Sequence, residues 1–175
     1  EGFLYVKGSG SDMASIEPAG FPALELEDLA DLQALPELSD LAMTKMLRAA
    51  KLDPDAPNPS VETLLHAFLP DKFVLHTHAN VVLALTNQAE GAKLCAKAFG
   101  ERAAVVPYAM SGLALAKKAA AARRNNPDVD GVVLMKHGLF TFGETAKEAY
   151  GRMIKLVSLA ETALTRPRSV LTGKI

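Results

Sequence analysis

The sequence of 175 residues has one cysteine, no dense block of lysine and arginine, and no apolar run of membrane-spanning length. The single Cys95 excludes an intramolecular disulfide and a metal site built from several cysteines. The formal charge of -1 and the missing basic block argue against nucleic acid or an anionic membrane as the main partner. A membrane-spanning helix needs about 20 apolar residues. These absences favour a protein of the reducing cytoplasm that works on small molecules.

No internal repeat, no low-complexity segment and no Gly-x-Gly-x-x-Gly turn of a dinucleotide-binding domain occurs in the sequence. A chain of 175 residues with 49% hydrophobic content fits one globular domain, which buries roughly 70% of the surface of the unfolded chain. Because the sequence opens inside a predicted strand, we expect some N-terminal residues to precede Glu1. We therefore predict a single domain over residues 1–175.

Hydrophobic periodicity predicts an alternation of strands and helices. Strands are expected at residues 3–7, 24–26, 73–78, 104–106, 132–135 and 139–142. Helices are expected at residues 28–35, 39–50, 61–69, 81–85, 89–99, 113–124 and 146–164. Ser39 and Ser60 are the expected N-caps of the second and third helices, and three prolines mark residues 52–59 as a loop. This order predicts an α/β sandwich in which helices cover both faces of a central sheet.

Two of the four histidines lie two residues apart on an apolar strand, in Val74-Leu75-His76-Thr77-His78. Because side chains alternate faces along a strand, both imidazoles point the same way. His137 lies in a second apolar run, before a glycine that lets the backbone bend. Three histidines and an open position describe a catalytic Zn²⁺ site, although Co²⁺, Ni²⁺ or Fe²⁺ also suit this ligand set. The alternative is that these histidines are only hydrogen-bonded structural residues.

Glu62 lies at the start of the helix that leads into the histidine strand, so its carboxylate can face the metal. A metal that polarises a bound carbonyl would let a neighbouring glutamate remove the proton on the adjacent carbon. The alternative is an ordinary acidic residue in the first turn, which the helix dipole favours.

A turn of small residues, Gly8-Ser9-Gly10-Ser11, follows the first strand. Its backbone N–H groups and hydroxyls form the kind of concavity that holds phosphate, although such turns are usually no more than turns. Ser60, at a helix N-terminus beside Glu62, is a second point that favours an anion. We interpret Tyr108 as a packing residue and Lys136 as a solvated residue on the strand face opposite His137.

These motifs together resemble the class II aldolase/adducin family. The resemblance rests on Pro59-Ser60-Val61-Glu62, His66, His76-Thr77-His78 and Lys136-His137-Gly138-Leu139-Phe140-Thr141-Phe142-Gly143. The segments Val6-Lys7-Gly8-Ser9-Gly10-Ser11-Asp12 and Pro59 to Pro70 are more closely similar to the aldolase part of bifunctional rhamnulose-phosphate aldolase/short-chain dehydrogenase proteins. The resemblance implies a three-layer α/β/α sandwich with a central, mainly antiparallel sheet.

The resemblance also implies an activity and roles for individual residues. It implies a Zn²⁺ ion held by His76, His78 and His137, with Glu62 as the acid/base and a further ligand in the empty enzyme. Ser9, Gly10 and Ser60 are implied to bind the substrate phosphate. The implied reaction is retro-aldol cleavage of a ketose 1-phosphate, with L-rhamnulose 1-phosphate giving dihydroxyacetone phosphate and L-lactaldehyde. A homotetramer is implied as the assembly.

Two positions depart from the family pattern. Val61 stands where some sugar-phosphate aldolases carry a second phosphate-binding serine, a change expected to weaken phosphate binding. Ala79 replaces a proline that mainly sets the turn into the next helix, a change expected to be tolerated. Two other functions therefore stay open. An epimerase or dehydratase on the same fold would use the same cation with a different proton path. An adducin-like binding module would keep the fold without the chemistry.

Overall fold

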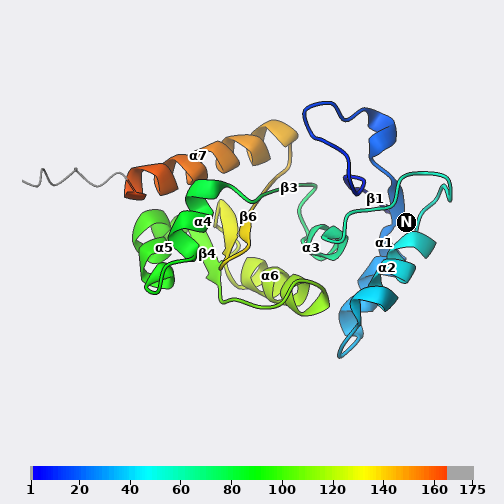
Figure 1. Ribbon diagram of the computed structural model, residues 1–175, viewed down its shortest axis with the longest axis horizontal. Helices are drawn as coiled ribbons and strands as arrows, with labels where there is room; N and C mark the ends of the chain where they lie inside the picture. The colour runs from blue at the N-terminus through cyan, green and yellow to red at the C-terminus, as the bar shows by residue number, and fades with distance from the viewer. Residues whose placement is uncertain (1, 165–175) are drawn as a thin grey trace, which may run out of the picture. The chain divides into compact units, whose positions relative to one another are not determined.

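A computed structural model describes residues 2–164 of the chain. Its strands and α-helices follow along the chain as β1 (Phe3–Tyr5), β2 (Ala23–Glu25), α1 (Leu26–Asp31), α2 (Asp40–Ala49), α3 (Thr63–Ala67), β3 (Phe73–Thr77), α4 (Asn80–Thr86), α5 (Gly91–Phe99), β4 (Ala103–Val106), α6 (Leu113–Asn125), β5 (Gly131–Leu134), β6 (Gly138–Gly143) and α7 (Ala146–Leu164) (Figure 1). Three short 3₁₀ segments are η1 (Pro18–Gly20), η2 (Leu32–Ala34) and η3 (Gly100–Arg102).

The chain divides into two compact units. The first unit contains the residues up to Val74 together with Ala109–Pro127, and the second contains Leu75–Tyr108 and the residues from Asp128 onward. The first unit therefore holds β1, β2 and the helices α1, α2, α3 and α6, while the second holds α4, α5, α7 and most of the main sheet.

The first unit is mainly helical. β1 pairs antiparallel with β2, and α3 packs against α6, whose buried positions include Ala116, Ala119 and Ala120. Near the end of α6 the guanidinium of Arg123 donates two hydrogen bonds, of 2.9 and 3.0 Å, to the carboxylate of Asp71. The segment just before β3 is thereby tied to the end of α6.

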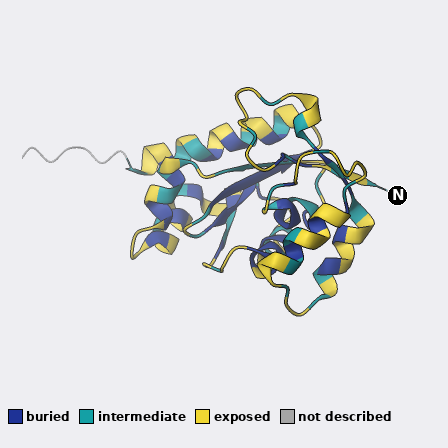
Figure 2. Cartoon of the chain, turned by 45° about the vertical axis from the view of Figure 1, so that its right-hand side comes forward, coloured by how far each residue is buried: buried dark blue, intermediate teal, exposed yellow. Residues whose placement is uncertain are grey.

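The second unit is built on a four-stranded sheet of order β3-β6-β5-β4. β5 pairs antiparallel with β6 and parallel with β4, and every residue of β5 and β6 is buried (Figure 2). Side chains of α4, α5 and α7 pack on the sheet in one hydrophobic cluster, which includes Val82, Cys95, Val133, Leu139 and Leu156. Burial raises the pKa of Cys95 to about 11, so this thiol stays protonated at neutral pH.

The predicted mixed α/β fold, with a sheet flanked by helices, is confirmed. Ser39 caps α2 as predicted, since its hydroxyl oxygen accepts the N–H of Ala42 at 3.3 Å. None of the helices within residues 2–164 combines the length and the apolar character of a membrane span.

The predicted helix over residues 61–69 is shorter than expected, and Ser60 is not its N-cap. α3 runs over Thr63–Ala67 and is preceded by Glu62. The hydroxyl oxygen of Ser60 accepts the N–H of Glu62 at 3.2 Å, while its carbonyl accepts the N–H of Thr63. These bonds form a separate turn before the helix. The predicted helix over 28–35 is likewise divided, into α1 and the 3₁₀ segment η2.

Candidate functional site

His76 lies on β3 with its ring half-buried against β6. Its Nδ1 lies 3.1 Å from the carbonyl oxygen of Leu139. A carbonyl only accepts, so Nδ1 carries the proton and the lone pair lies on Nε2, a buried nitrogen. Metal-binding histidines ordinarily donate their second N–H in this way, which fixes the tautomer and the direction of the ring.

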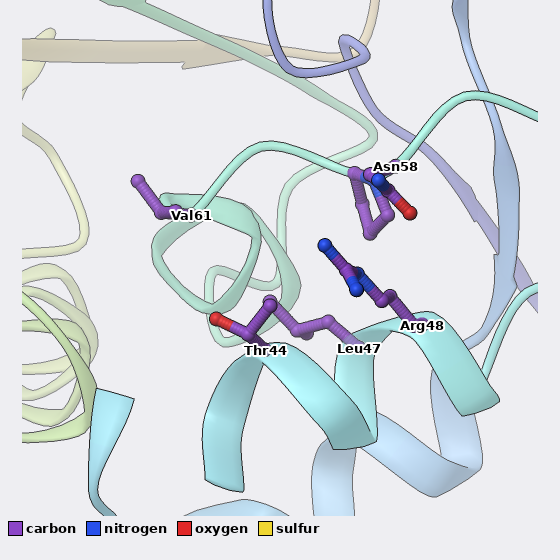
Figure 3. A pocket seen from close by; sticks show the side chains of 6 residues that line it. Thr44, Leu47, Arg48, Asn58 and Val61 are labelled. Carbon is purple, nitrogen blue, oxygen red and sulfur yellow. The ribbon is translucent and has the colours of Figure 1, made fainter. Parts of the chain in front are cut away.

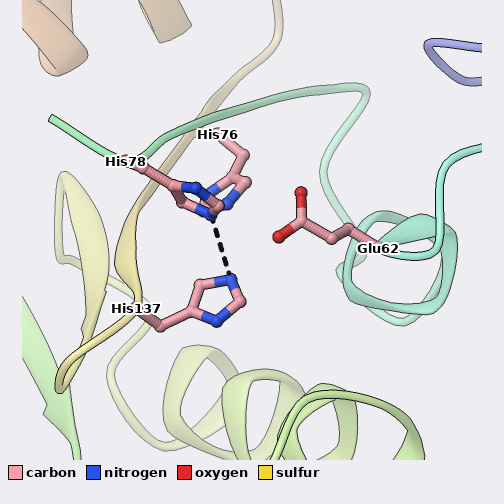
Figure 4. A group of neighbouring side chains, drawn as sticks. All are labelled: Glu62, His76, His78 and His137. Carbon is pink, nitrogen blue, oxygen red and sulfur yellow. Dashed lines mark hydrogen bonds between the residues drawn. The ribbon is translucent and has the colours of Figure 1, made fainter. Parts of the chain in front are cut away.

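His78 and His137 complete a cluster of three imidazoles in the second unit (Figure 4). The ring centroids of His76 and His78 are 4.6 Å apart, as the two-residue spacing on a strand predicts. The Nε2 atoms of His78 and His137 lie 3.4 Å apart. One ring nitrogen from each of the three histidines lies within 4.8 Å of one from each of the others.

The three nitrogens have the chemistry and the spacing of a divalent-metal site. In a tetrahedron with metal–nitrogen bonds of 2.0–2.1 Å, two ligand nitrogens lie roughly 3.3 Å apart. The 3.4 Å between His78 and His137 is close to that separation. Neutral imidazole suits Zn²⁺ and several other transition-metal ions. The cluster could therefore hold a divalent cation with a position open to substrate.

The turn between β5 and β6 brings His137 to the other two histidines. Lys136 in this turn has φ 61°, a left-handed conformation that is uncommon for residues other than glycine. Its side chain is exposed as predicted, but it lies in the turn rather than on a strand, with its ammonium 5.9 Å from the ring centroid of Tyr108. Tyr108 is 56% exposed, so its interpretation as a packing residue is wrong.

Gly138 follows directly and leaves no room for a side chain. A Cβ atom there would lie 2.5 Å from the carbonyl oxygen of Thr77, 2.9 Å from Cε1 of His76 and 3.0 Å from Cδ2 of His78. The missing side chain therefore lets the start of β6 lie directly against His76 on β3 and against His78, just after the end of β3.

Glu62 belongs to the first unit. It is half-buried and precedes the first residue of α3. Its backbone N–H donates to the hydroxyl oxygen of Ser60. The turn that contains Ser60 therefore fixes the backbone from which the Glu62 carboxylate extends.

The Gly8–Ser11 turn and the segment before Glu62 lie side by side within the first unit. Gly8 forms an antiparallel bridge with Pro59, and the N–H of Ser9 donates to the carbonyl of Asn58 at 2.7 Å. Gly10 has φ 80°, which glycine adopts without strain. The structure thus brings together the residues that we predicted to bind phosphate.

The way in which this turn would hold an anion differs from our expectation. The backbone N–H groups of Ser9 and Ser60 already donate to carbonyls, so they are not available to a phosphate. Both residues carry a side-chain hydroxyl. The hydroxyl oxygen of Ser60 accepts the backbone N–H of Glu62, so the hydroxyl hydrogen of Ser60 can donate to an anion. Lys7 adds positive charge, since its ammonium lies 3.1 Å from the carbonyl of Gly8.

A small pocket lies beside this segment, between α2 and the loop that precedes Ser60 (Figure 3). It is lined by Thr44, Leu47, Arg48, Asn58, Pro59 and Val61. Arg48 is the charged residue among these six. Neither Ser9 nor Ser60 lines the pocket, so we regard it as separate from the predicted phosphate turn.

Comparison with known proteins identifies the family. The sequence pattern of the Class II Aldolase and Adducin N-terminal domain matches residues 1–164. The chain belongs to this family. This class II aldolase/adducin domain is 38% identical over 158 residues to a Bacillus subtilis (strain 168) protein named uncharacterized oxidoreductase YuxG. The match covers 90% of this chain and 23% of YuxG, so the chain spans about a quarter of that relative.

Solved structures agree with the family assignment. The N-terminal class II aldolase domain of a conserved protein from Thermoplasma acidophilum is 42% identical, with a TM-score of 0.85, and the match covers 91% of this chain and 74% of that one. The L-fuculose-1-phosphate aldolase of Thermus thermophilus has a TM-score of 0.60 at 19% identity, covering 93% of this chain and 81% of that one. At this identity the second likeness shows the fold alone.

Sequence reasoning missed the residues that support the histidines. The carbonyl of Leu139 and the ring of Phe140, whose centroid lies 4.0 Å from that of His76, both belong to β6. The sequence signal was the apolar strand directly after His137. That signal could not be used without knowing that β6 is the neighbour of β3 in the sheet.

Proposed function

We propose that this domain binds a divalent metal ion, Zn²⁺ in the first place, and catalyses retro-aldol cleavage of a ketose 1-phosphate. The observation that carries the proposal is the cluster of His76, His78 and His137, whose ring nitrogens lie within 4.8 Å of one another. A module that kept the fold only for assembly would have no need of such a cluster. Membership of the family, and the aldolase named among its structural neighbours, support aldol chemistry.

L-Rhamnulose 1-phosphate is the substrate that we propose, with dihydroxyacetone phosphate and L-lactaldehyde as products. The support is the resemblance of the Gly8–Ser11 turn and of the segment from Pro59 to the aldolase part of bifunctional rhamnulose-phosphate aldolase/dehydrogenase proteins. The relative YuxG is named an oxidoreductase, and this chain matches 23% of it. We therefore propose that the aldolase domain works in a longer protein that also carries a dehydrogenase.

In the proposed mechanism, the bound cation supplies Lewis acidity that stabilises negative charge on the substrate oxygens. The Nδ1–H of His76 donates to the Leu139 carbonyl, which would leave Nε2 as the ligand atom for the cation. Glu62 would move the proton at carbon 3. During cleavage the carbon 4 hydroxyl would lose its proton to water, the bond between carbons 3 and 4 would break, and carbon 4 would become the aldehyde carbon. The electron pair left on carbon 3 would take a proton from the Glu62 carboxyl group, which regains a proton from water, so protons balance over the step.

The substrate phosphate is proposed to bind at the turn of the first unit. The hydroxyls of Ser9 and Ser60 and the backbone of Gly10 would contact its oxygens, and the ammonium of Lys7 adds positive charge. Hydroxyl donors to a phosphate form charge-assisted hydrogen bonds, which are stronger than bonds between neutral groups.

The test begins with elemental analysis of protein purified without added cations or chelators. The metal-loaded protein is then incubated with ketose 1-phosphates, L-rhamnulose 1-phosphate first, and the products are identified by mass. Two fragments are expected from an aldolase, whereas an epimerase gives one product of unchanged mass and a dehydratase one product that has lost water. Protein that binds no metal would favour the adducin-like binding module.

Replacement of the proposed acid/base gives a sharper test. Glu62→Gln should lower kcat by about 10²–10⁴-fold, because general acid–base catalysis contributes an acceleration of that order. Bound metal should stay near one ion per chain, since the three histidines remain. Unchanged cleavage by Glu62→Gln would remove this residue from the mechanism.

A further inference from the structure

We infer that Phe140 is a positioning residue for the proposed metal centre, which holds the imidazole of His76 in the plane that directs Nε2 at the cation. This inference rests on the metal-binding part of the proposed function. It adds a residue that has no ligand atom and cannot touch the metal or the substrate through a polar group.

The first observation is the stacking of the two rings. The ring centroids of His76 and Phe140 lie 4.0 Å apart, and their planes differ by 12°. Rotation of the imidazole out of its plane would push ring atoms into the phenyl face. Phe140 has no exposed surface, so it cannot move aside into solvent. The phenyl ring therefore blocks one side of the His76 ring.

The second observation is that the same strand also fixes the edge of the imidazole. The carbonyl of Leu139 accepts the Nδ1 proton of His76 at 3.1 Å, and Leu139 packs in the cluster with α4, α5 and α7. Adjacent side chains on a strand point to opposite faces, so Phe140 lies on the other face of β6. On one face of β6, Leu139 thus packs in the hydrophobic core, while on the other face Phe140 stacks on the ring of His76.

Together these contacts leave His76 little freedom before a metal arrives. The hydrogen bond sets the tautomer, and the stacked phenyl ring holds the imidazole in the plane in which that hydrogen bond forms. Outer partners of metal ligands typically change metal affinity by 10–100-fold when they are replaced. The hydrogen bond from the main chain cannot be removed by a side-chain substitution, which makes Phe140 the accessible test of this arrangement.

The chain offers a matched control in Phe142. This residue has the same type, lies on the same strand and has no exposed surface either. It is two residues further along β6, which places it roughly 6–7 Å from the position of Phe140. Replacing either phenylalanine by leucine removes the same atoms from the interior, so the two variants should be destabilised to a similar degree.

The experiment compares the wild type, Phe140→Leu and Phe142→Leu in two measurements. Competitive titration with Zn²⁺, and the visible absorption of bound Co²⁺, report the metal site. Nitrogen-15 NMR of the metal-free proteins reports the His76 tautomer. We expect Phe140→Leu to bind Zn²⁺ about 10–100-fold more weakly, with an altered Co²⁺ spectrum and a mixture of His76 tautomers. Phe142→Leu should retain the affinity within about threefold and the single tautomer, by the same reasoning.

Equal effects of the two substitutions on affinity and tautomer would overturn the inference, because they would reduce Phe140 to an ordinary core residue. Should either leucine variant fail to fold, Phe140→Met and Phe142→Met keep more of the volume and are compared in the same way. A wild type that binds no metal would refute the proposed function. In that case the tautomer measurement still decides whether Phe140 holds His76.

Discussion

The histidine cluster of the second unit and the Gly8–Ser11 turn of the first unit are built in opposite ways. In the cluster, side chains provide the binding atoms and main chain supports them, as the carbonyl of Leu139 does for His76. In the turn, main-chain groups bond to one another, as Ser9 does to Asn58, and hydroxyls are left for a ligand. The cluster therefore depends on the chemical identity of single residues, and the turn depends on backbone conformation.

This difference predicts different responses to substitution. Loss of one imidazole removes one of the three proposed nitrogen ligands. Loss of one hydroxyl in the turn leaves the backbone bridge between Gly8 and Pro59 in place. Both regions nevertheless contain a glycine at which the chain approaches itself closely, Gly138 in one and Gly8 in the other. Paired substitutions can therefore test how far the contrast holds.

The largest effect is expected for His78→Ala. This change removes one of the three nitrogens, and Zn²⁺ affinity should fall by more than the roughly 10–100-fold that an outer partner costs. Elemental analysis after dialysis should find near-stoichiometric zinc in the wild type and little in the variant. His66→Ala is the control, because His66 lies on α3 and is not a member of the cluster. Full zinc content in His78→Ala would contradict the site.

A smaller loss of metal affinity is expected for Gly138→Ala, about 10–100-fold. The added methyl group would lie 2.5 Å from the carbonyl oxygen of Thr77 and 2.9 Å from His76, so the strand or the histidines must move. Overpacking of this kind also costs about 1–3 kcal/mol in the free energy of unfolding. Zinc titration and thermal unfolding measure the two effects. A variant with wild-type zinc affinity would show that the close approach is not needed for binding.

Gly8→Ala is the matched change in the first unit. Its methyl group would lie 2.8 Å from the carbonyl oxygen of Gly20 and 3.0 Å from Cβ of Pro57. We expect a loss of about 1–3 kcal/mol in the free energy of unfolding and a higher KM for the ketose 1-phosphate, with zinc affinity unchanged. If the zinc affinity of Gly8→Ala fell as far as that of Gly138→Ala, the proposed difference between the turn and the histidine cluster would be wrong.

Local sequence rules predicted much of the fold and the three residues of the histidine cluster. The two-residue spacing of His76 and His78 on an apolar strand was sufficient to place both rings together, and the glycine after His137 marked the turn that brings in the third. Ser39 was recognised as an N-cap because capping depends on residues next to each other in the chain. Such features need no knowledge of distant contacts.

Features that depend on distant pairing could not be predicted. The support of His76 by Leu139 and Phe140 requires β3 and β6 to be neighbours, and the sequence does not give strand order. Ser9 was expected to offer its N–H to an anion, but that group pairs with Asn58, about 50 residues away. α3 begins later than predicted because Ser60 forms a turn of its own. The homotetramer, the cytoplasmic location and the phosphorylated ketose stay predictions.

The smallest effect is expected at Asp130, which joins the start of β5 to α7 in the second unit. Its carboxylate accepts hydrogen bonds from Lys155 at 3.0 Å and from Arg102 at 3.1 Å. Burial alone would raise the pKa of Asp130, but these bonds and the positive charges of Lys155 and Arg102 hold the pKa below its ordinary value. A lowered pKa stabilises the folded state above the pKa of the unfolded chain, about 3.9, and this contribution is lost as the pH falls toward the folded value.

Asp130→Asn should therefore lower the free energy of unfolding by about 1 kcal/mol at pH 7, which is the upper range for partly exposed ion pairs. The difference from the wild type should shrink below pH 4, where the wild-type carboxylate takes up its proton. Denaturant unfolding at pH 7 and pH 3 measures both values. Since Asp130 supports the sheet but none of the three ligands, zinc affinity at pH 7 should be unchanged. A parallel loss of zinc would show that the cluster depends on the whole sheet and not only on β6.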